Sequence, residues 1–237
     1  GIRDEIDSLN LSEVEKSVAL TSLIMAMDEV DNTLGHFVSY LKEWSARSYK
    51  TINLKVPKIF VNEGDHVVIK SDIFKSLSDV VVDFAYYDPP YGSNNEKMPP
   101  SRVRYASYYH LWTTICKNDQ PELFGAALRR LDSSDTIAAT IFEEFRKDET
   151  GSHIAVQAID QLLELTQAKY VALSYSSGGI ATARELHETL KRHGKLIKTI
   201  ELDYRKNVMA DMKWTNEWLR DAAEPNKEFI FLIDKQA

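Results

Sequence analysis

The stretch Val80–Tyr91, VVVDFAYYDPPY, is the most informative part of this sequence. Its first eight residues are an apolar run rich in β-branched and aromatic side chains, which is typical of a buried strand in a parallel sheet. Asp88-Pro89-Pro90-Tyr91 then ends the strand, because each proline fixes φ and removes a backbone donor. Ligands bind at the carboxyl ends of strands in open α/β sheets, so we expect a binding site at this tetrapeptide.

Apolar runs and helical periodicity alternate around this strand. We expect further strands at 59–61, 67–69, 169–175, 195–202 and 228–233, and helices near 105–118, 136–148, 151–166 and 180–193. This alternation predicts an α/β fold with a parallel, doubly wound sheet, in which the last two strands form an antiparallel edge.

The N-terminal part of the chain has a different pattern. Ser12 and Glu15 fit a capping box, and apolar residues at helical spacing follow, so residues 12–46 are expected to be helical with a break near Gly35. We therefore divide the chain into a helical region, 1–57, which is a candidate for DNA recognition, and a catalytic sheet domain, 58–237.

Composition limits the class of protein. The 237 residues are 43% hydrophobic, and no apolar run approaches the roughly 18 residues of a membrane span, so we expect a soluble, cytoplasmic protein. Cys116 is the single cysteine, which excludes an internal disulfide and predicts no zinc site, and we expect it buried in a helix. The net charge of -7 argues mildly against a nucleic-acid partner, although basic residues gather locally, as in Lys191–Lys206.

The tetrapeptide presents hydrogen-bond acceptors to a ligand. With two prolines in place, the groups left to point into the site are the Asp88 carboxylate and the carbonyls of Asp88 and Pro89. Such a set suits a donor with two hydrogens, an exocyclic amine, whose lone pair is then exposed for in-line attack on a methyl sulfonium. Tyr91 offers a flat face on which an extruded base can stack.

On these residues the sequence resembles the Dam-like DNA adenine methyltransferases, particularly the branch whose domains also occur in FokI-type modification enzymes. The resemblance implies a Rossmann-like methyltransferase sheet, S-adenosylmethionine as methyl donor and double-stranded DNA as substrate. In that family the first tetrapeptide residue and the following proline carbonyl hold the target amine, and the tyrosine stacks on the flipped adenine. Asp88, Pro89, Pro90 and Tyr91 occupy these positions here.

Three further segments take part in the resemblance. Lys70–Phe74 is similar to the family's short acidic motif, which implies that Asp72 contacts the adenosine part of the cofactor. Tyr105–Leu111 is similar to the segment that follows the tetrapeptide, which implies a substrate-binding role for Tyr108. Ser174 and Tyr175 match the strand-end motif that lines the target-base pocket in the family.

One family motif is missing. The family begins with a Phe-x-Gly-x-Gly loop after its first strand, whose glycines let the backbone approach the cofactor. Residues 1–58 contain only Gly1 and Gly35, and neither follows a predicted strand. The sheet is therefore expected to be incomplete at its N-terminal end. Either the sequence is a fragment of a longer enzyme, or a second chain supplies the missing strand and loop.

The functional prediction is a bacterial or phage-borne DNA adenine methyltransferase of the restriction-modification type. Arg102 and Arg104, in the loop after the tetrapeptide, are the expected phosphate or base contacts, since arginine can read guanine bidentately. The main alternative is a non-catalytic DNA-binding or assembly subunit of a split methyltransferase. A third possibility keeps the chemistry with RNA or a protein glutamine amide as substrate.

Overall fold

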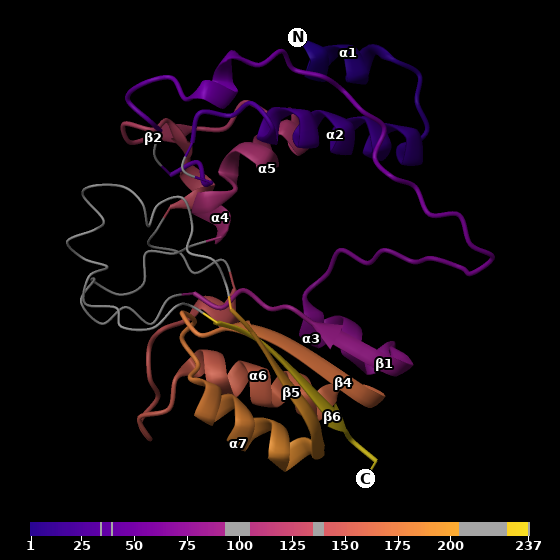
Figure 1. Cartoon of the computed structure of the whole chain (residues 1–237), viewed down its shortest axis with the longest axis vertical. Helices are drawn as coiled ribbons and strands as arrows, with labels where there is room; N and C mark the ends of the chain where they lie inside the picture. Colours follow the sequence, from indigo (N-terminus) through magenta and orange to yellow (C-terminus); the bar gives the residue numbers. More distant parts are fainter. Residues whose placement is uncertain (34, 39, 93–104, 135–139, 204–226, 237) are drawn as a thin grey trace. The chain divides into compact units, whose positions relative to one another are not determined.

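The computed structural model describes residues 1–33, 35–38, 40–92, 105–134, 140–203 and 227–236. The chain forms two compact units (Figure 1). The helical unit contains Gly1–Val67 and Ala106–Ile137, and the sheet unit contains Val68–Tyr105 and Ala138–Ala237. The predicted boundary between residues 57 and 58 does not coincide with these bounds, because the helical unit also takes up residues from the middle of the chain.

The sheet unit is built on four strands in the order β1-β4-β6-β5. Their bounds are β1 Val81–Tyr87, β4 Gln167–Ser176, β5 Lys195–Asp203 and β6 Lys227–Asp234. β1 runs parallel to β4, whereas β6 runs antiparallel to both β4 and β5. The structure thus confirms the α/β class, the strand before the tetrapeptide and the antiparallel pairing of the last two strands.

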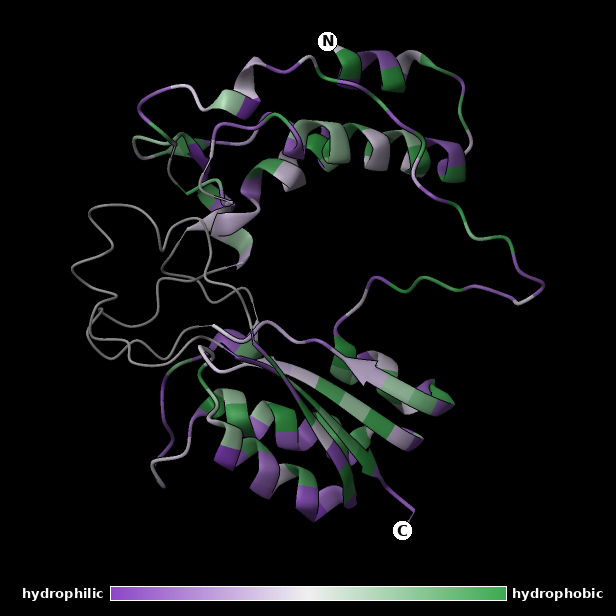
Figure 2. Cartoon of the chain, in the orientation of Figure 1, coloured by the Kyte–Doolittle hydropathy of each residue, from purple (hydrophilic) through white to green (hydrophobic). Residues whose placement is uncertain are grey.

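Two helices cover one face of this sheet, α6 (Ile154–Leu165) and α7 (Ala183–His193) (Figure 1). A capping box between Thr182 and Glu185 begins α7. Figure 2 shows hydrophobic residues along β6 and hydrophilic residues over much of α7. The core lies between helices and strands, where the following side chains are 0% exposed: Ile159, Leu163, Val171, Leu173, Leu186, Leu190, Phe231 and Ile233.

The opposite face of the sheet is more exposed. Successive side chains of a strand point to opposite faces, and Ala85 of β1 belongs to the core, so Phe84 and Tyr86 point away from it. These two aromatic side chains are 52% and 54% exposed. β1 is also the first strand in the order, so its outer edge has no strand partner among the described residues.

The helical unit contains α1, α2 and α5, together with short elements. The bounds are α1 Ile2–Ser8, α2 Glu13–Asp28, η1 Ala46–Tyr49, α5 His110–Lys117, β2 Leu123–Phe124, β3 Arg129–Arg130 and η3 Leu131–Ser133. The remaining short helices are α3 Ile73–Ser76, η2 Leu77–Asp79 and η4 Ile141–Glu143 in the sheet unit, and α4 Tyr105–Tyr108, which begins there. The capping box of Ser12 and Glu15 that was predicted for α2 is confirmed.

The sequence overestimated the length of the N-terminal helix. α2 ends at Asp28 instead of continuing toward residue 46. Asp31 and Asn32 follow, and both use their side chains locally: Asp31 accepts from Thr33 Oγ1 at 2.7 Å, and Asn32 Oδ1 accepts from the Ser45 amide at 2.8 Å. Such bonds favour turns over helix.

Other expectations for secondary structure were also wrong. Residues 59–61 and 67–69 form no strand, because they find no pairing partner, and Val61 and Val68 are 94% and 96% exposed. In the described part of 136–148 the only helical turn is η4, so the predicted helix is absent there. Cys116 lies in α5 as expected, but it is exposed and not buried.

Candidate active site

The tetrapeptide Asp88–Tyr91 leaves the carboxyl end of β1, beside the carboxyl half of β4. The register pairs Tyr87 of β1 with Leu173 of β4, so the chain reaches the edge of the sheet at Asp88. Asp88 is exposed, Pro89 is buried, and Pro90 and Tyr91 are half-buried. The prolines thus fix the backbone against the protein while the Asp88 carboxylate remains open to solvent.

The loop after β4 holds the last residue of the tetrapeptide. The Ile180 amide donates to the Tyr91 carbonyl at 2.8 Å, and the Tyr175 hydroxyl donates to the same oxygen at 3.3 Å. Gly92 follows with a φ of +57°, and a Cβ there would lie 2.6 Å from Ile180 Cδ1. The backbone around Tyr91 is therefore packed closely against this loop. A side chain at position 92 would be strained by the positive φ and would displace the end of the Ile180 side chain.

A groove of about 740 Å³ brings the two predicted acidic residues together. Its lining includes Asp72 and Asp88, with Phe74 and Phe142, whose rings stack at 5.8 Å between centroids. Asp72 is the N-cap of α3, and its Oδ1 accepts from the Phe74 amide at 3.0 Å. The capping role and a ligand-binding role are compatible, because the cap bond uses one oxygen of the carboxylate.

Ser174 and Tyr175 lie near the end of β4 and have different environments. Ser174 is half-buried and pairs with Ile230 of β6. Tyr175 is 1% exposed, and burial raises the pKa of its hydroxyl to about 12. Almost none of its side chain reaches the surface. The role of Tyr175 in lining the target-base pocket stays a prediction.

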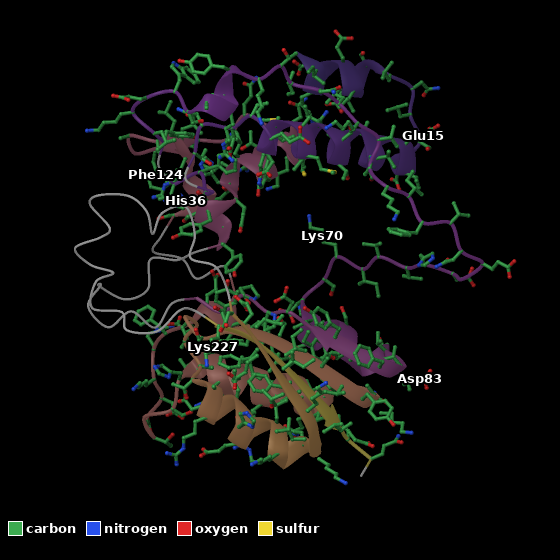
Figure 3. All side chains as sticks on the ribbon, viewed as in Figure 1. Glu15, His36, Lys70, Asp83, Phe124 and Lys227 are labelled. Carbon is green, nitrogen blue, oxygen red and sulfur yellow. The ribbon has the colours of Figure 1, made fainter. Side chains whose placement is uncertain are left out.

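Glu228 is a candidate site residue that the sequence analysis missed. It is the second residue of β6 and pairs with Ser176 of β4, at the same end of the sheet as the tetrapeptide. Figure 3 labels the neighbouring Lys227 at this end and Asp83 at the other. Burial raises the pKa of Glu228, the negative charge of Asp88 raises it further, and a hydrogen bond with Ser176 opposes the shift. A glutamate at a strand start carries no sequence signal, since only the strand order brings it near Asp88.

Tyr108 belongs to the helical unit, and its described contacts are made within that unit. Its ring stacks on His36 at 4.5 Å, and its carbonyl accepts from the Phe37 amide at 2.9 Å. His110 begins α5, is 4% exposed and contacts the Phe37 carbonyl through Nε2 at 3.0 Å. Burial lowers the pKa of His110, so a structural role fits it better than one in proton transfer.

The two predicted arginine contacts, Arg102 and Arg104, lie outside the described residues. Within the described ranges, no group of three or more His, Cys, Asp or Glu residues is arranged to hold a metal ion. In the same part of the chain, every helix is too short or too polar to span a membrane.

The chain is similar in sequence to known proteins over most of its length. Residues 1–144 match the family model of the D12 class N6 adenine-specific DNA methyltransferase. The chain is 29% identical over 226 residues to the type II methyltransferase M.FokI of Planomicrobium okeanokoites, an alignment that covers 95% of this chain and 31% of that protein. It is 27% identical over 213 residues to the modification methylase StsI of Streptococcus sanguinis, covering 86% of this chain and 29% of that protein.

A third relative is shorter. The type II methyltransferase M.NlaIII of Neisseria lactamica is 22% identical over 216 residues, which cover 91% of this chain and 57% of that protein. The chain thus spans about a third of the first two relatives and somewhat more than half of the third. No solved structure matches it. With more than half of its residues matched by the family model, this chain belongs to the D12 class N6 adenine-specific DNA methyltransferases.

Proposed function

We propose that this chain provides the amine-holding part of a DNA adenine methyltransferase that uses S-adenosylmethionine. The observation that carries the proposal is the exposed Asp88 carboxylate at the carboxyl end of β1, in one groove with Asp72. The Asp88 carboxylate accepts one N–H of the target amine, and the Pro89 carbonyl accepts the other. Both acceptors become stronger partners as positive charge develops on the nitrogen, which favours the transition state over the bound substrate.

The residues of the groove fit part of the proposed cofactor. Asp72 supplies an acceptor for a ribose hydroxyl or an adenine amine, and Phe74 and Phe142 supply flat apolar surface for the adenine ring. S-Adenosylmethionine supplies an electrophilic methyl group when it is bound. The residues of this chain would hold its adenosine end, while Asp88 keeps the acceptor amine in line with the methyl group.

The substrate in this proposal is an adenine flipped out of double-stranded DNA, since the target amine is out of reach inside the duplex. Tyr91 is half-buried, and its exposed part can stack on the base. Ser174, at the carboxyl end of β4, lines the base pocket in this proposal. Tyr108 of the helical unit and the two arginines of the following loop, Arg102 and Arg104, contact the DNA. The helical unit as a whole is the proposed recognition region.

The open edge of β1 supports a further element of the proposal. Its strand residues Val81, Phe84 and Tyr86 are 74%, 52% and 54% exposed. An apolar strand with an unpaired edge invites pairing with another strand. We propose a Rossmann-like methyltransferase sheet that is completed at this edge by a strand with a Gly-rich cofactor loop, carried by a further segment or a second chain. This observation also favours the second candidate function, an assembly subunit that is active only with a partner.

A methyl-transfer assay with isotope-labelled cofactor distinguishes these functions. Wild type and Asp88→Ala are incubated with double-stranded DNA and with RNA, each with and without a segment that carries the Gly-rich loop. Incorporation into DNA that is lost in Asp88→Ala supports the main proposal. Incorporation only after the segment is added supports the assembly subunit. Incorporation into RNA alone would contradict the DNA assignment.

A further inference from the structure

The loop between β4 and α7 binds the tetrapeptide through its backbone. The Ile180 amide donates to the Tyr91 carbonyl at 2.8 Å, and the Gly179 amide donates to the Ser176 carbonyl at 3.0 Å. Between them these bonds tie Tyr91 to the end of β4. The position of the Tyr91 backbone therefore depends on the conformation of this loop. The same holds for the point from which the Tyr91 side chain extends.

Tyr175 is the side chain at the centre of this contact. Its hydroxyl accepts from the Ala181 amide at 3.1 Å and donates to the Tyr91 carbonyl at 3.3 Å. A phenol can do both at once, because it has one donor and acceptor lone pairs, whereas phenylalanine can do neither. The hydroxyl thus links the loop to the tetrapeptide at a position where the ring is 1% exposed.

The ring of Tyr91 contacts the rings of two other tyrosines. Tyr91 lies edge-on to Tyr175, with centroids 5.8 Å apart, and edge-on to Tyr105, with centroids 6.1 Å apart. The Tyr105 amide is held in turn by the carboxylate of Glu143, which is 0% exposed, at 2.7 Å. Edge-to-face contacts on two sides restrict the directions in which the Tyr91 ring can turn.

Gly179 permits this close packing. A Cβ at this position would lie 2.4 Å from Cε1 of Tyr175 and 2.9 Å from Cβ of Tyr91. Both distances are too short for carbon atoms, so a side chain at residue 179 would displace one of the two tyrosines. The glycine is needed for space here, because its φ lies outside the left-handed region.

We propose that Tyr175 and Gly179 are positioning residues, which set the place of Tyr91 and so the stacking of the target base without touching that base. This inference rests on the proposed function for its consequence in catalysis, but the contact itself can be tested separately. It gives Tyr175 a different role from that of a pocket-lining residue. The hydroxyl, and not the aromatic ring alone, is what the inference requires.

The first test measures the position of Tyr91 directly and needs no activity. Wild type and Tyr175→Phe are labelled with 3-fluorotyrosine, and the ¹⁹F signal of Tyr91 is assigned by its loss in Tyr91→Phe. Loss of the hydroxyl is expected to shift or broaden this signal, because the ring gains alternative orientations. An unchanged Tyr91 signal in Tyr175→Phe would overturn the inference.

The second test measures the consequence for the reaction. In Tyr175→Phe, kcat is expected to fall roughly 10- to 100-fold, the scale of a small misplacement of reacting groups, with the dissociation constant of the cofactor within about twofold of wild type. Fluorescence of 2-aminopurine at the target position reports base stacking in the same variant. Gly179→Ala is expected to lower kcat in the same way, through steric displacement.

A destabilised control separates positioning from a general loss of stability. Ile233→Val removes one methylene from a side chain that is 0% exposed and that pairs with Val171 of β4, whose partner in β1 is Ala85. It is expected to lower the melting temperature and to leave kcat and the 2-aminopurine signal unchanged. A Tyr175→Phe kcat within twofold of wild type would refute the inference. If wild type transfers no methyl group even with a segment that carries the Gly-rich loop, the proposed function fails, and the ¹⁹F signal alone decides whether Tyr175 positions Tyr91.

Discussion

On the amine side of the groove, Tyr91 is fixed by two hydrogen bonds to its carbonyl and by the rings of Tyr105 and Tyr175. On the side of the β1 edge, Asp72 is exposed, and the strand ladder ends without a partner among the described residues. The residues around Tyr91 are therefore held by more contacts than the residues around Asp72. In the proposed function, this chain holds the target amine, and tight cofactor binding requires a further strand and the Gly-rich loop.

The largest expected change in activity follows substitution of Asp88, in the part of the site that holds the target amine. Asp88→Ala removes an acceptor that strengthens in the transition state, so kcat is expected to fall by about 10²–10³-fold with little change in DNA affinity. Asp83→Ala is the matched control, because Asp83 lies in β1, the strand that leads to Asp88, and is also exposed. Steady-state methyl transfer and DNA binding measure the two effects. Equal losses of activity in the two variants would contradict a role of Asp88 in holding the target amine.

The second prediction concerns the open edge. In hydrogen exchange, amides of β1 are expected to exchange faster than those in the middle of β4. Within the described ranges, β4 has a strand on both sides and β1 has a strand on one side. A segment that supplies a strand and the Gly-rich loop should slow the exchange of the β1 amides. The same segment should also strengthen cofactor binding. Protection of β1 equal to that of β4 in this chain alone would contradict an open edge.

The third prediction tests the role of Asp72. Asp72→Ala loses both the cap of α3 and the carboxylate, with a cap contribution of about 0.5–2 kcal/mol. Asp72→Asn keeps a capping oxygen and loses only the charge. If the carboxylate holds the cofactor, both variants weaken cofactor binding in calorimetry, roughly tenfold, a typical effect of one charged hydrogen bond. Wild-type affinity in Asp72→Asn would leave Asp72 with a capping role only.

The smallest expected effect is electrostatic and concerns Glu228. Asp88→Asn should lower the pKa of Glu228, because the charge of Asp88 adds to the effect of burial, and Ser176→Ala should raise it. The raised pKa means that the folded state binds this proton more tightly than the unfolded state. Its effect on stability is therefore unfavourable at neutral pH and is relieved as the pH falls through the folded-state pKa. NMR titration of the Glu228 carboxyl carbon measures both shifts, and a pKa unaffected by Asp88→Asn would place the two carboxylates too far apart to interact.

The sequence predicted the elements whose signals are local. The apolar run before Asp88, the capping box of Ser12 and Glu15, and the helix expected near 180–193 are all determined by neighbouring residues, and all three are observed. Residues 59–61 and 67–69 have strand-like composition, but a strand also needs a partner that is set by tertiary structure. Short apolar runs of this kind cannot be assigned from periodicity alone.

Only the part of the candidate site that is formed by neighbouring residues could be predicted from the sequence. The residues of the tetrapeptide lie next to one another in the sequence, so their chemistry could be recognised before the fold was known. Glu228 is far away in the chain, and it reaches this end of the sheet only because β6 inserts between β4 and β5. The burial of Tyr175 likewise depends on the loop that folds over it after β4.

Analysis of methylated nucleosides tests the central claim most directly. Double-stranded DNA is incubated with S-adenosylmethionine and wild type or Asp88→Ala, with the complementing segment present, then digested to nucleosides and examined by mass spectrometry. We expect N6-methyladenine as the product of wild type and none above background with Asp88→Ala. A methylated cytosine as the main product, or N6-methyladenine formed equally well by Asp88→Ala, would contradict it.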